Sequence, residues 1–271
     1  MNKFWIALFA TVPIMAIAFF LIGMSKGNGL WLPVNITSIG EEIDHLFWVI
    51  LALTGVTFFG VEAVFIWFLI KYGGDKNPGK GIYSHGNPKL ETIWTIIPAG
   101  ILVFLALYQY DTWKDAKFKV NAPSQDQPVH ARVTGGQFEW RLTYPGADGQ
   151  LDTADDLEQV NVLHVVKNEP TRLQLRSRDV LHSFFIPAAR LKQDLVPGMP
   201  NQQMWFTVIH TDDDPSQADV HEIACAELCG WGHYKMRGFL KVHETREQFE
   251  AWFQDALAKQ NATTEDLGLP E

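Results

Sequence analysis

Cysteine is scarce in this chain: only two of its 271 residues are cysteine, and both lie in the short stretch CAELCGWGHYKM. Two cysteines cannot build the disulfide framework of a small secreted scaffold. The sequence also contains no C-x-x-C-H motif, glycine-rich phosphate-binding loop, internal repeat or low-complexity tract. These absences exclude a c-type haem attached to this chain and a P-loop nucleotide site.

Basic residues are in the minority, because 22 Lys and Arg stand against 31 Asp and Glu, which gives a net charge of −9. The whole acidic excess falls after residue 110. Such a surface disfavours nucleic acid as a partner and suits a basic protein.

Long apolar runs are confined to the first 110 residues, at positions 4–22, 46–70 and 93–110. Each is close to the roughly 20 residues with which a helix crosses a bilayer. We predict a transmembrane helical hairpin over residues 25–110. Residues 1–24 are either an N-terminal membrane span or a removable signal segment. A retained span is favoured, because the run contains Pro13 and ends without a small-residue cleavage site.

The loop between the second and third runs sets the predicted orientation, since it contains Lys71, Lys76, Lys80 and Lys89. By the positive-inside rule this loop is cytoplasmic. Residues 111–271 are then a separate domain on the outer face, which is the periplasmic face of a bacterial inner membrane. A mitochondrial inner membrane is the alternative location, and membrane lipid is an expected partner in both.

Residues 111–271 contain short segments rich in Val, Ile, Thr and aromatic residues: VHARVT, QFEWRLTY, VNVLHVV, TRLQLRS, VLHSFFI, QMWFTVIH, VHEIACA and RGFLKVH. Their length and frequency predict an antiparallel β-sandwich or barrel. Helical periodicity returns only at 246–260, which predicts an amphipathic C-terminal helix. Its apolar face consists of Phe249, Trp252, Phe253 and Leu257. The acidic insert 145–159 is expected to be a solvated hairpin tip, with a calcium site as the alternative.

The two cysteines belong to a metal-ligand pattern. Cys229, His233 and Met236 offer a thiolate, an imidazole and a thioether at the spacing of a blue-copper loop, and such a site needs one further histidine. His182, in the strand-like segment VLHSFFI, is placed to supply it. Cys225 adds a second thiolate, and two neighbouring thiolates can each bridge two copper ions. A disulfide between the cysteines and a zinc site are the alternatives, although a disulfide explains neither His233 nor Met236.

The stretch CAELCGWGHYKM, together with DVLHSFFIP, LKQDLVPG and HGNPKLETIWTIIP, resembles cytochrome c oxidase subunit II over roughly residues 45–245. The resemblance implies N-terminal transmembrane helices followed by an all-β, cupredoxin-like Greek-key sandwich with a C-terminal amphipathic helix. It also implies a dinuclear copper A centre. The ligands would be His182, Cys225, Cys229, His233, Met236 and the Glu227 carbonyl.

Further roles are implied only by this resemblance. The Glu227 side chain would reach a magnesium or manganese ion at the interface with the catalytic subunit, and Glu91 would admit protons to one input path. Phe138 and Trp140, in GGQFEW, would mark the region where electrons arrive. The family usually has tryptophan at position 138 and arginine at position 199, where this chain has Phe138 and Met199. We therefore expect a bound or tethered c-type cytochrome as the donor, with a soluble cytochrome as the alternative.

The function implied is electron input to a cytochrome c oxidase-type terminal oxidase. Electrons would pass from a c-type cytochrome through copper A to haems held only by the catalytic subunit I, with subunit III as a further partner. Oxygen reduction in that complex would be coupled to proton translocation. The alternatives are a membrane-anchored cupredoxin that stores or delivers copper, and the copper A subunit of a nitric-oxide reductase.

Overall fold

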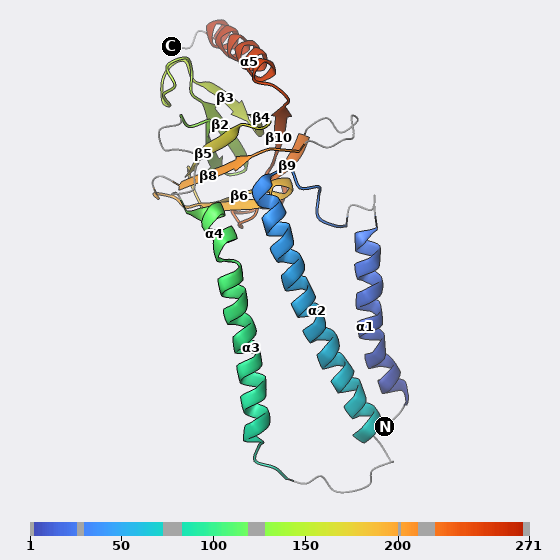
Figure 1. The fold of residues 1–271 in the computed structure, drawn as a ribbon. Helices are drawn as coiled ribbons and strands as arrows, with labels where there is room; N and C mark the ends of the chain where they lie inside the picture. Colours follow the sequence, from blue (N-terminus) through green and yellow to red (C-terminus); the bar gives the residue numbers. More distant parts are fainter. Residues whose placement is uncertain are drawn as a thin grey trace. The chain divides into compact units, whose positions relative to one another are not determined.

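The computed structural model describes residues 3–25, 30–72, 83–118, 128–199, 202–210 and 220–267, and the chain divides into two compact units (Figure 1). Unit 1 comprises residues 1–32 and 45–111, and unit 2 comprises residues 33–44 and 112–271. Lys76 and Lys80, on which the predicted orientation depends, lie outside the described residues.

Unit 1 is built from three apolar helices: α1 (Lys3–Met24), α2 (Ser38–Tyr72), which begins in unit 2, and α3 (Pro88–Tyr108). Their mean hydropathies of 2.5, 2.2 and 2.0 make each long and apolar enough to cross a membrane, which confirms the three predicted apolar helices. Phe9 of α1 meets Phe65 of α2 edge to face at 4.9 Å. Tyr108 of α3 lies within hydrogen-bonding distance of His45 of α2, with Oη 3.0 Å from Nδ1.

Glu91 has a structural role at the start of α3. The Asn87 side chain accepts hydrogen bonds from the backbone N–H groups of Lys89 and Leu90, and Pro88 occupies the first helical position. The Glu91 carboxylate accepts the backbone N–H of Asn87 at 3.2 Å. This reciprocal cap satisfies N–H groups that an α-helix leaves without a partner.

Unit 2 contains ten strands: β1 (Ala131–Gly136), β2 (Glu139–Tyr144), β3 (Leu157–Val160), β4 (Val162–Val166), β5 (Pro170–Ser177), β6 (His182–Ile186), β7 (Leu191–Leu195), β8 (Gln202–Thr207), β9 (Val220–Cys225) and β10 (Arg237–His243). They form two five-stranded sheets with the orders β3-β2-β1-β5-β8 and β4-β10-β9-β6-β7 (Figure 1). The predicted all-β sandwich is confirmed. The sheets are not purely antiparallel, because β1 pairs with β5 and β4 with β10 in parallel. This correction follows from the chain crossing between sheets, which brings strands distant in sequence together.

The sandwich core consists of side chains that alternate along the strands. In β5, Leu173 and Leu175 are buried while Arg172, Gln174 and Arg176 lie on the other face. Full burial of one large apolar side chain contributes roughly 1.5–3 kcal/mol. The segment VNVLHVV, expected as one strand, is divided by Asn161, whose φ of 61° ends β3 and lets β4 begin in the other sheet.

Residues 33–44 complete the sandwich, although the sequence placed them with the membrane part. Ile36 has no exposed surface, and Thr37 bridges to Val208. The Thr37 hydroxyl donates to the Ala189 carbonyl at 3.1 Å. Asp44 accepts a hydrogen bond from Arg190 at 2.6 Å. The β domain therefore includes this segment in addition to the predicted residues 111–271.

Two helices accompany the sheets. The short helix α4 (Tyr110–Lys117) precedes the first strand, and α5 (Arg246–Leu267) follows the last. The predicted apolar face of α5 packs on the core, and its members are Phe249, Trp252, Phe253 and Leu257. The helix is longer than the expected 246–260.

A pair of histidines lies beneath α5. His164 of β4 has Nδ1 2.8 Å from Nε2 of His243 of β10, and the His164 ring stacks on Trp252 at 3.5 Å. Burial lowers the pKa of His164 to about 3, and the nearby His243, Lys241 and His130 add to the shift. Burial also lowers the pKa of His243. Both rings are thus neutral in the folded chain at neutral pH.

We expect the docking of α5 to weaken on acidification. Histidines whose pKa is depressed by folding give their full stabilisation above the unfolded pKa of roughly 6.5, and lose it as pH falls toward the folded value. Hydrogen exchange of α5 amides, corrected for intrinsic rates, should therefore show less protection at pH 5 than at pH 7.5. His164→Phe keeps a ring on Trp252 but cannot titrate, so its protection should depend less on pH. An equal pH dependence in the two chains would contradict this role.

Candidate metal centre

Three neighbouring strands bring the predicted ligands together. His182 begins β6, Cys225 ends β9, and Met236 immediately precedes β10. The metal loop, residues 226–236, connects β9 to β10 and is closed at its base by the Cys225 N–H, which donates to the Met236 carbonyl at 3.2 Å. The Ala226 N–H donates to the Ser183 carbonyl at 2.9 Å, which fixes the start of the loop beside β6.

The donor atoms of these residues form one chain of contacts. Cys225 Sγ lies 3.9 Å from His182 Nδ1, 3.8 Å from Cys229 Sγ and 3.2 Å from the Glu227 carbonyl oxygen. Cys229 Sγ in turn lies 3.7 Å from both His233 Nδ1 and Met236 Sδ. The structure therefore brings all six predicted ligand groups together, with the two sulfurs in the middle.

Burial makes this a closed site. His182 has no exposed surface, and Cys225, Cys229 and Met236 are buried. Burial, followed by the charge of the neighbouring Cys225, raises the pKa of the Cys229 thiol to about 12. A metal must displace this proton to bind the sulfur, so metal binding here releases protons.

Asp179 orients His182. Its Oδ1 lies 2.7 Å from His182 Nε2, and because a carboxylate only accepts, Nε2 carries the proton and Nδ1 presents a lone pair to the cluster. Burial raises the pKa of Asp179, but the hydrogen bonds from His182 and from the backbone N–H groups of Gln137 and Val180 outweigh it, and the pKa is lowered. Gln137 also donates its side-chain amide to the Cys229 carbonyl at 2.6 Å.

Sequence reasoning missed both of these supporting residues. Asp179 stands three positions before His182, and this carboxylate–histidine spacing was a usable signal. Gln137 had no such signal, because it reaches a carbonyl 92 positions away.

The donor set fits copper. Thiolate sulfur and imidazole nitrogen lie about 2.3 and 2.0 Å from a bound metal ion, so two donors sharing one ion at a tetrahedral angle are roughly 3.6 Å apart. The spacings of the cluster match this value. Both cysteines are free thiols, and a thioether beside two thiolates suits copper rather than zinc. Among the described residues, the group of His, Cys, Asp and Glu close enough to hold a metal ion is His182, Cys225 and Cys229.

The two aromatic residues expected where electrons arrive lie beneath the loop. Trp140 has no exposed surface and contacts His182, with ring centroids 6.0 Å apart, so a donor cannot touch it directly. Alternation along β2 turns Trp140 into the core, and its part in electron entry stays a prediction. Phe138 is half-buried, and its ring lies under Gly232, where an added Cβ would come within 2.3 Å of Cδ2.

The carboxylates of the acidic insert 145–159 are engaged within the loop and with the sheet. Asp152 forms a two-pronged ion pair with Arg132, and Asp156 accepts the Asp152 backbone N–H at 2.8 Å. Asp155 accepts the Thr153 hydroxyl at 2.8 Å. These bonds organise the hairpin tip.

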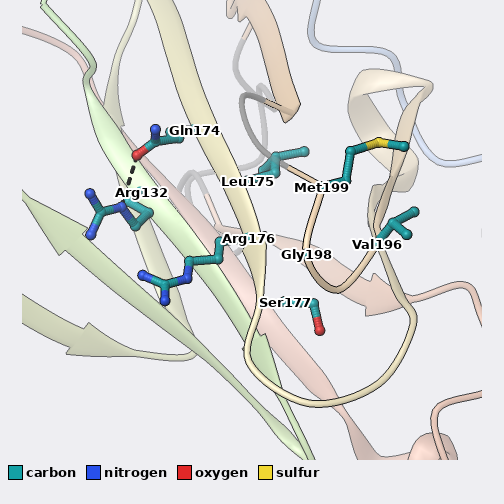
Figure 2. Close-up of a pocket in the computed structure, with 8 residues that line it drawn as sticks. All are labelled: Arg132, Gln174, Leu175, Arg176, Ser177, Val196, Gly198 and Met199. Carbon is teal, nitrogen blue, oxygen red and sulfur yellow. Dashed lines mark hydrogen bonds between the residues drawn. The ribbon is translucent and has the colours of Figure 1, made fainter.

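Met199 lines an open pocket of about 350 Å³ that is distinct from the metal cluster (Figure 2). Arg132 and Arg176 of the neighbouring strands β1 and β5 supply its basic lining, and Arg132 Nε donates to Gln174 at 2.8 Å. The pocket therefore retains positive charge, although position 199 itself carries none.

Comparison with known families gives two matches that together cover most of the chain. The family model of the cytochrome c oxidase subunit II transmembrane domain matches residues 25–111. The model of the cytochrome c oxidase subunit II periplasmic domain matches residues 138–242. The second range contains every residue of the metal cluster.

Individual proteins show the same similarity. Cytochrome c oxidase subunit 2 of Alkalihalophilus pseudofirmus is 30% identical, with 98% of this chain and 73% of that protein covered. The subunit of the same name from Thermostichus vulcanus is 29% identical, with 82% and 77% covered. Among solved structures, the periplasmic domain of subunit II of cytochrome oxidase (CoxB) of Bradyrhizobium japonicum is 27% identical. It covers 51% of this chain and 98% of its own, with a TM-score of 0.41.

Proposed function

Because the chain belongs to the cytochrome c oxidase subunit II family, we propose that its β domain takes electrons from a c-type cytochrome and passes them to the haems of a catalytic subunit. Members of this family are membrane-anchored subunits of haem–copper oxidases, which are oxidoreductase complexes. The observation that carries the proposal is the cluster of two buried cysteine thiols, two imidazoles, a thioether and a carbonyl.

The ligands would hold two copper ions. The residues that would hold them are Cys225, Cys229, His182, His233, Met236 and, through its carbonyl, Glu227. Copper supplies one-electron chemistry between Cu(I) and Cu(II). Neighbouring strands β6, β9 and β10 of one sheet hold the ligands in place, and Asp179 keeps the His182 ring in one orientation. A rigid, water-excluding site changes little between redox states, which favours fast electron transfer.

The surroundings of the site follow from the same proposal. Subunits I and III of the oxidase would be the partners, with the β domain on the periplasmic face of a bacterial inner membrane. The Glu227 side chain would reach magnesium or manganese at the interface with subunit I. Oxygen would be reduced in subunit I, coupled to proton translocation.

Purification from membranes tests the function. Copurification of haem-containing subunits, two coppers per chain and oxygen uptake driven by reduced cytochrome c would support it. A lone copper-loaded chain would indicate copper storage or delivery, because nothing else in that case would use the electrons. Nitric oxide reduction without oxygen uptake would indicate a nitric-oxide reductase.

The proposed donor is a bound or tethered c-type cytochrome, since Phe138 offers less contact area than tryptophan. Turnover with soluble cytochrome c should then be slow and should vary little with salt. Fast turnover that falls steeply as ionic strength rises would instead indicate a freely diffusing, charge-steered donor.

Glu91→Gln is expected to slow oxygen turnover while leaving copper content and copper reduction unchanged. Glutamine keeps an oxygen that can accept the Asn87 N–H, so the helix cap survives while the ionisable group is lost. The matched control is Glu91→Ala, which removes both. Equal turnover in the wild type and Glu91→Gln would show that Glu91 is only a capping residue. An altered copper spectrum in Glu91→Gln would contradict a role limited to proton input.

A further inference from the structure

Three large side chains of the metal loop face solvent. Leu228, Trp231 and Tyr234 expose 75%, 85% and 71% of their surface, and together we call them the loop patch. Exposed apolar groups that cluster on a soluble face mark sites of interaction. These three alternate along the loop with the predicted ligands Cys229 and His233, so the loop that carries the ligands also carries the patch.

The backbone around Trp231 directs its side chain outward. Gly230 has a φ of 126°, and a Cβ there would lie 2.6 Å from the Gln137 amide nitrogen. A Cβ at Gly232 would lie 2.3 Å from the Phe138 ring. The glycines on both sides of Trp231 are thus pressed against β-domain residues beneath them. Phe138 supports the loop, and the indole projects on the opposite side.

Among the described aromatic residues of the site, Trp231 and its neighbour Tyr234 are the exposed ones. Trp140 is fully buried and Phe138 is half-buried beneath the loop. Trp231 is two residues from Cys229 and two from His233. Only a short stretch of backbone therefore separates its exposed side chain from each of these two ligands. A partner that touches the indole would come closer to the sulfurs than one resting on the sheets.

We propose that Trp231, flanked by Leu228 and Tyr234, is the contact at which the electron donor meets this chain. The proposal rests on the proposed function and specifies its donor side. The donor would be a small electron-carrier protein whose cofactor edge is exposed in an apolar surface with a basic rim. In each encounter the reduced carrier loses one electron and the copper centre gains it, with no bond or proton transferred.

Charge and size favour this occupant over the catalytic subunit. The net charge of −9 lies entirely on residues 111–271, which attracts a basic carrier over long range. Near the loop, Arg237 is paired with Glu222 at 3.3 Å, while Lys235 is an exposed basic residue of the loop itself. A patch of three side chains suits the brief, repeated contacts of a carrier domain that is tethered to the complex, whereas permanent interfaces are larger. Tryptophan and tyrosine also carry polar groups that tolerate water between encounters.

The test uses the whole oxidase with Trp231→Ala, Trp231→Phe and the control Trp113→Ala, which alters a tryptophan of α4 that is 52% exposed. Copper reduction by reduced cytochrome c is followed by stopped flow, alongside reduction by a small inorganic reductant. Trp231→Ala should lower the second-order rate constant for cytochrome roughly 10- to 30-fold, as loss of a central aromatic contact does. Trp231→Phe should lower it less, and Trp113→Ala should stay within about twofold. Copper content, the electron resonance spectrum and reduction by the small reductant should not change.

Two results would overturn the proposal. One is an unchanged cytochrome rate constant in Trp231→Ala. The other is a Trp231→Ala chain that binds copper but no longer copurifies with the catalytic subunit, which would place the patch in that interface. Failure of the proposed function would be seen in the wild-type complex itself, which would then lack copper or would not be reduced by cytochrome c.

Discussion

Replacing Cys225 or Cys229 with serine is expected to remove the dinuclear centre and lower electron input from cytochrome c by more than about 100-fold. Loss of even a residue that supports a metal ligand costs 10- to 100-fold in metal affinity or activity, and a bridging thiolate contributes to both ions. Copper per chain and the electron resonance spectrum of the purified complex measure the effect. Lys235→Ser, at an exposed position of the same loop, should retain two coppers.

The two substitutions should differ from each other. Cys229 Sγ lies 3.7 Å from both His233 Nδ1 and Met236 Sδ, so Cys225→Ser leaves a thiolate, an imidazole and a thioether that can hold one copper. Cys229→Ser leaves Cys225, whose sulfur contacts His182. In the described part of the chain, Cys225 makes no such contact with His233 or Met236. We therefore expect a mononuclear blue spectrum from Cys225→Ser and weaker copper binding in Cys229→Ser. Two coppers with full electron transfer in either variant would show that the thiolates do not bridge.

Ile36→Ala is expected to lower the free energy of unfolding of the β domain by about 2–5 kcal/mol, the usual cost of emptying a buried aliphatic site. Ile36 has no exposed surface and sits in the sandwich core, although it precedes α2. Denaturant titration of the detergent-solubilised chain, followed by near-UV circular dichroism, measures the loss.

Val34→Ala is the matched control, because Val34 belongs to the same segment but is 61% exposed. Its effect should stay within about 0.5 kcal/mol. Equal effects of the two substitutions would show that the segment 33–44 lies on the surface of the sandwich and does not contribute to its core. A domain that begins at residue 111 lacks Ile36, Thr37 and Asp44, and should unfold at lower denaturant than one that includes them.

Local spacing made much of the site predictable. Cys225, Cys229, His233 and Met236 fall within twelve residues, so a single loop presents them whatever the rest of the fold does. The apolar runs and the face of α5 were predictable for a similar reason, since helix length and periodicity depend on neighbouring residues. Asp179 could have been added from its spacing to His182.

Contacts between distant segments were decided by the closing of the sandwich. The parallel pairs β1–β5 and β4–β10, the hydrogen bond from Gln137 to Cys229 and the burial of Ile36 all join residues far apart in the chain. No periodicity encodes them, because they depend on which strands cross from one sheet to the other.

The aromatic residues near the proposed copper ligands show most clearly what the sequence determined and what the tertiary structure decided. The sequence by itself placed Trp231 inside the metal motif, and only the family resemblance assigned Phe138 and Trp140 to the region where electrons arrive. Only the tertiary structure decided their roles: the pleat of β2 buries Trp140, the loop glycines pack on Phe138, and Trp231 is left facing solvent. The physical reason is that exposure depends on what packs against a side chain: segments distant in the chain cover Trp140 and part of Phe138, whereas the Trp231 side chain stays 85% exposed.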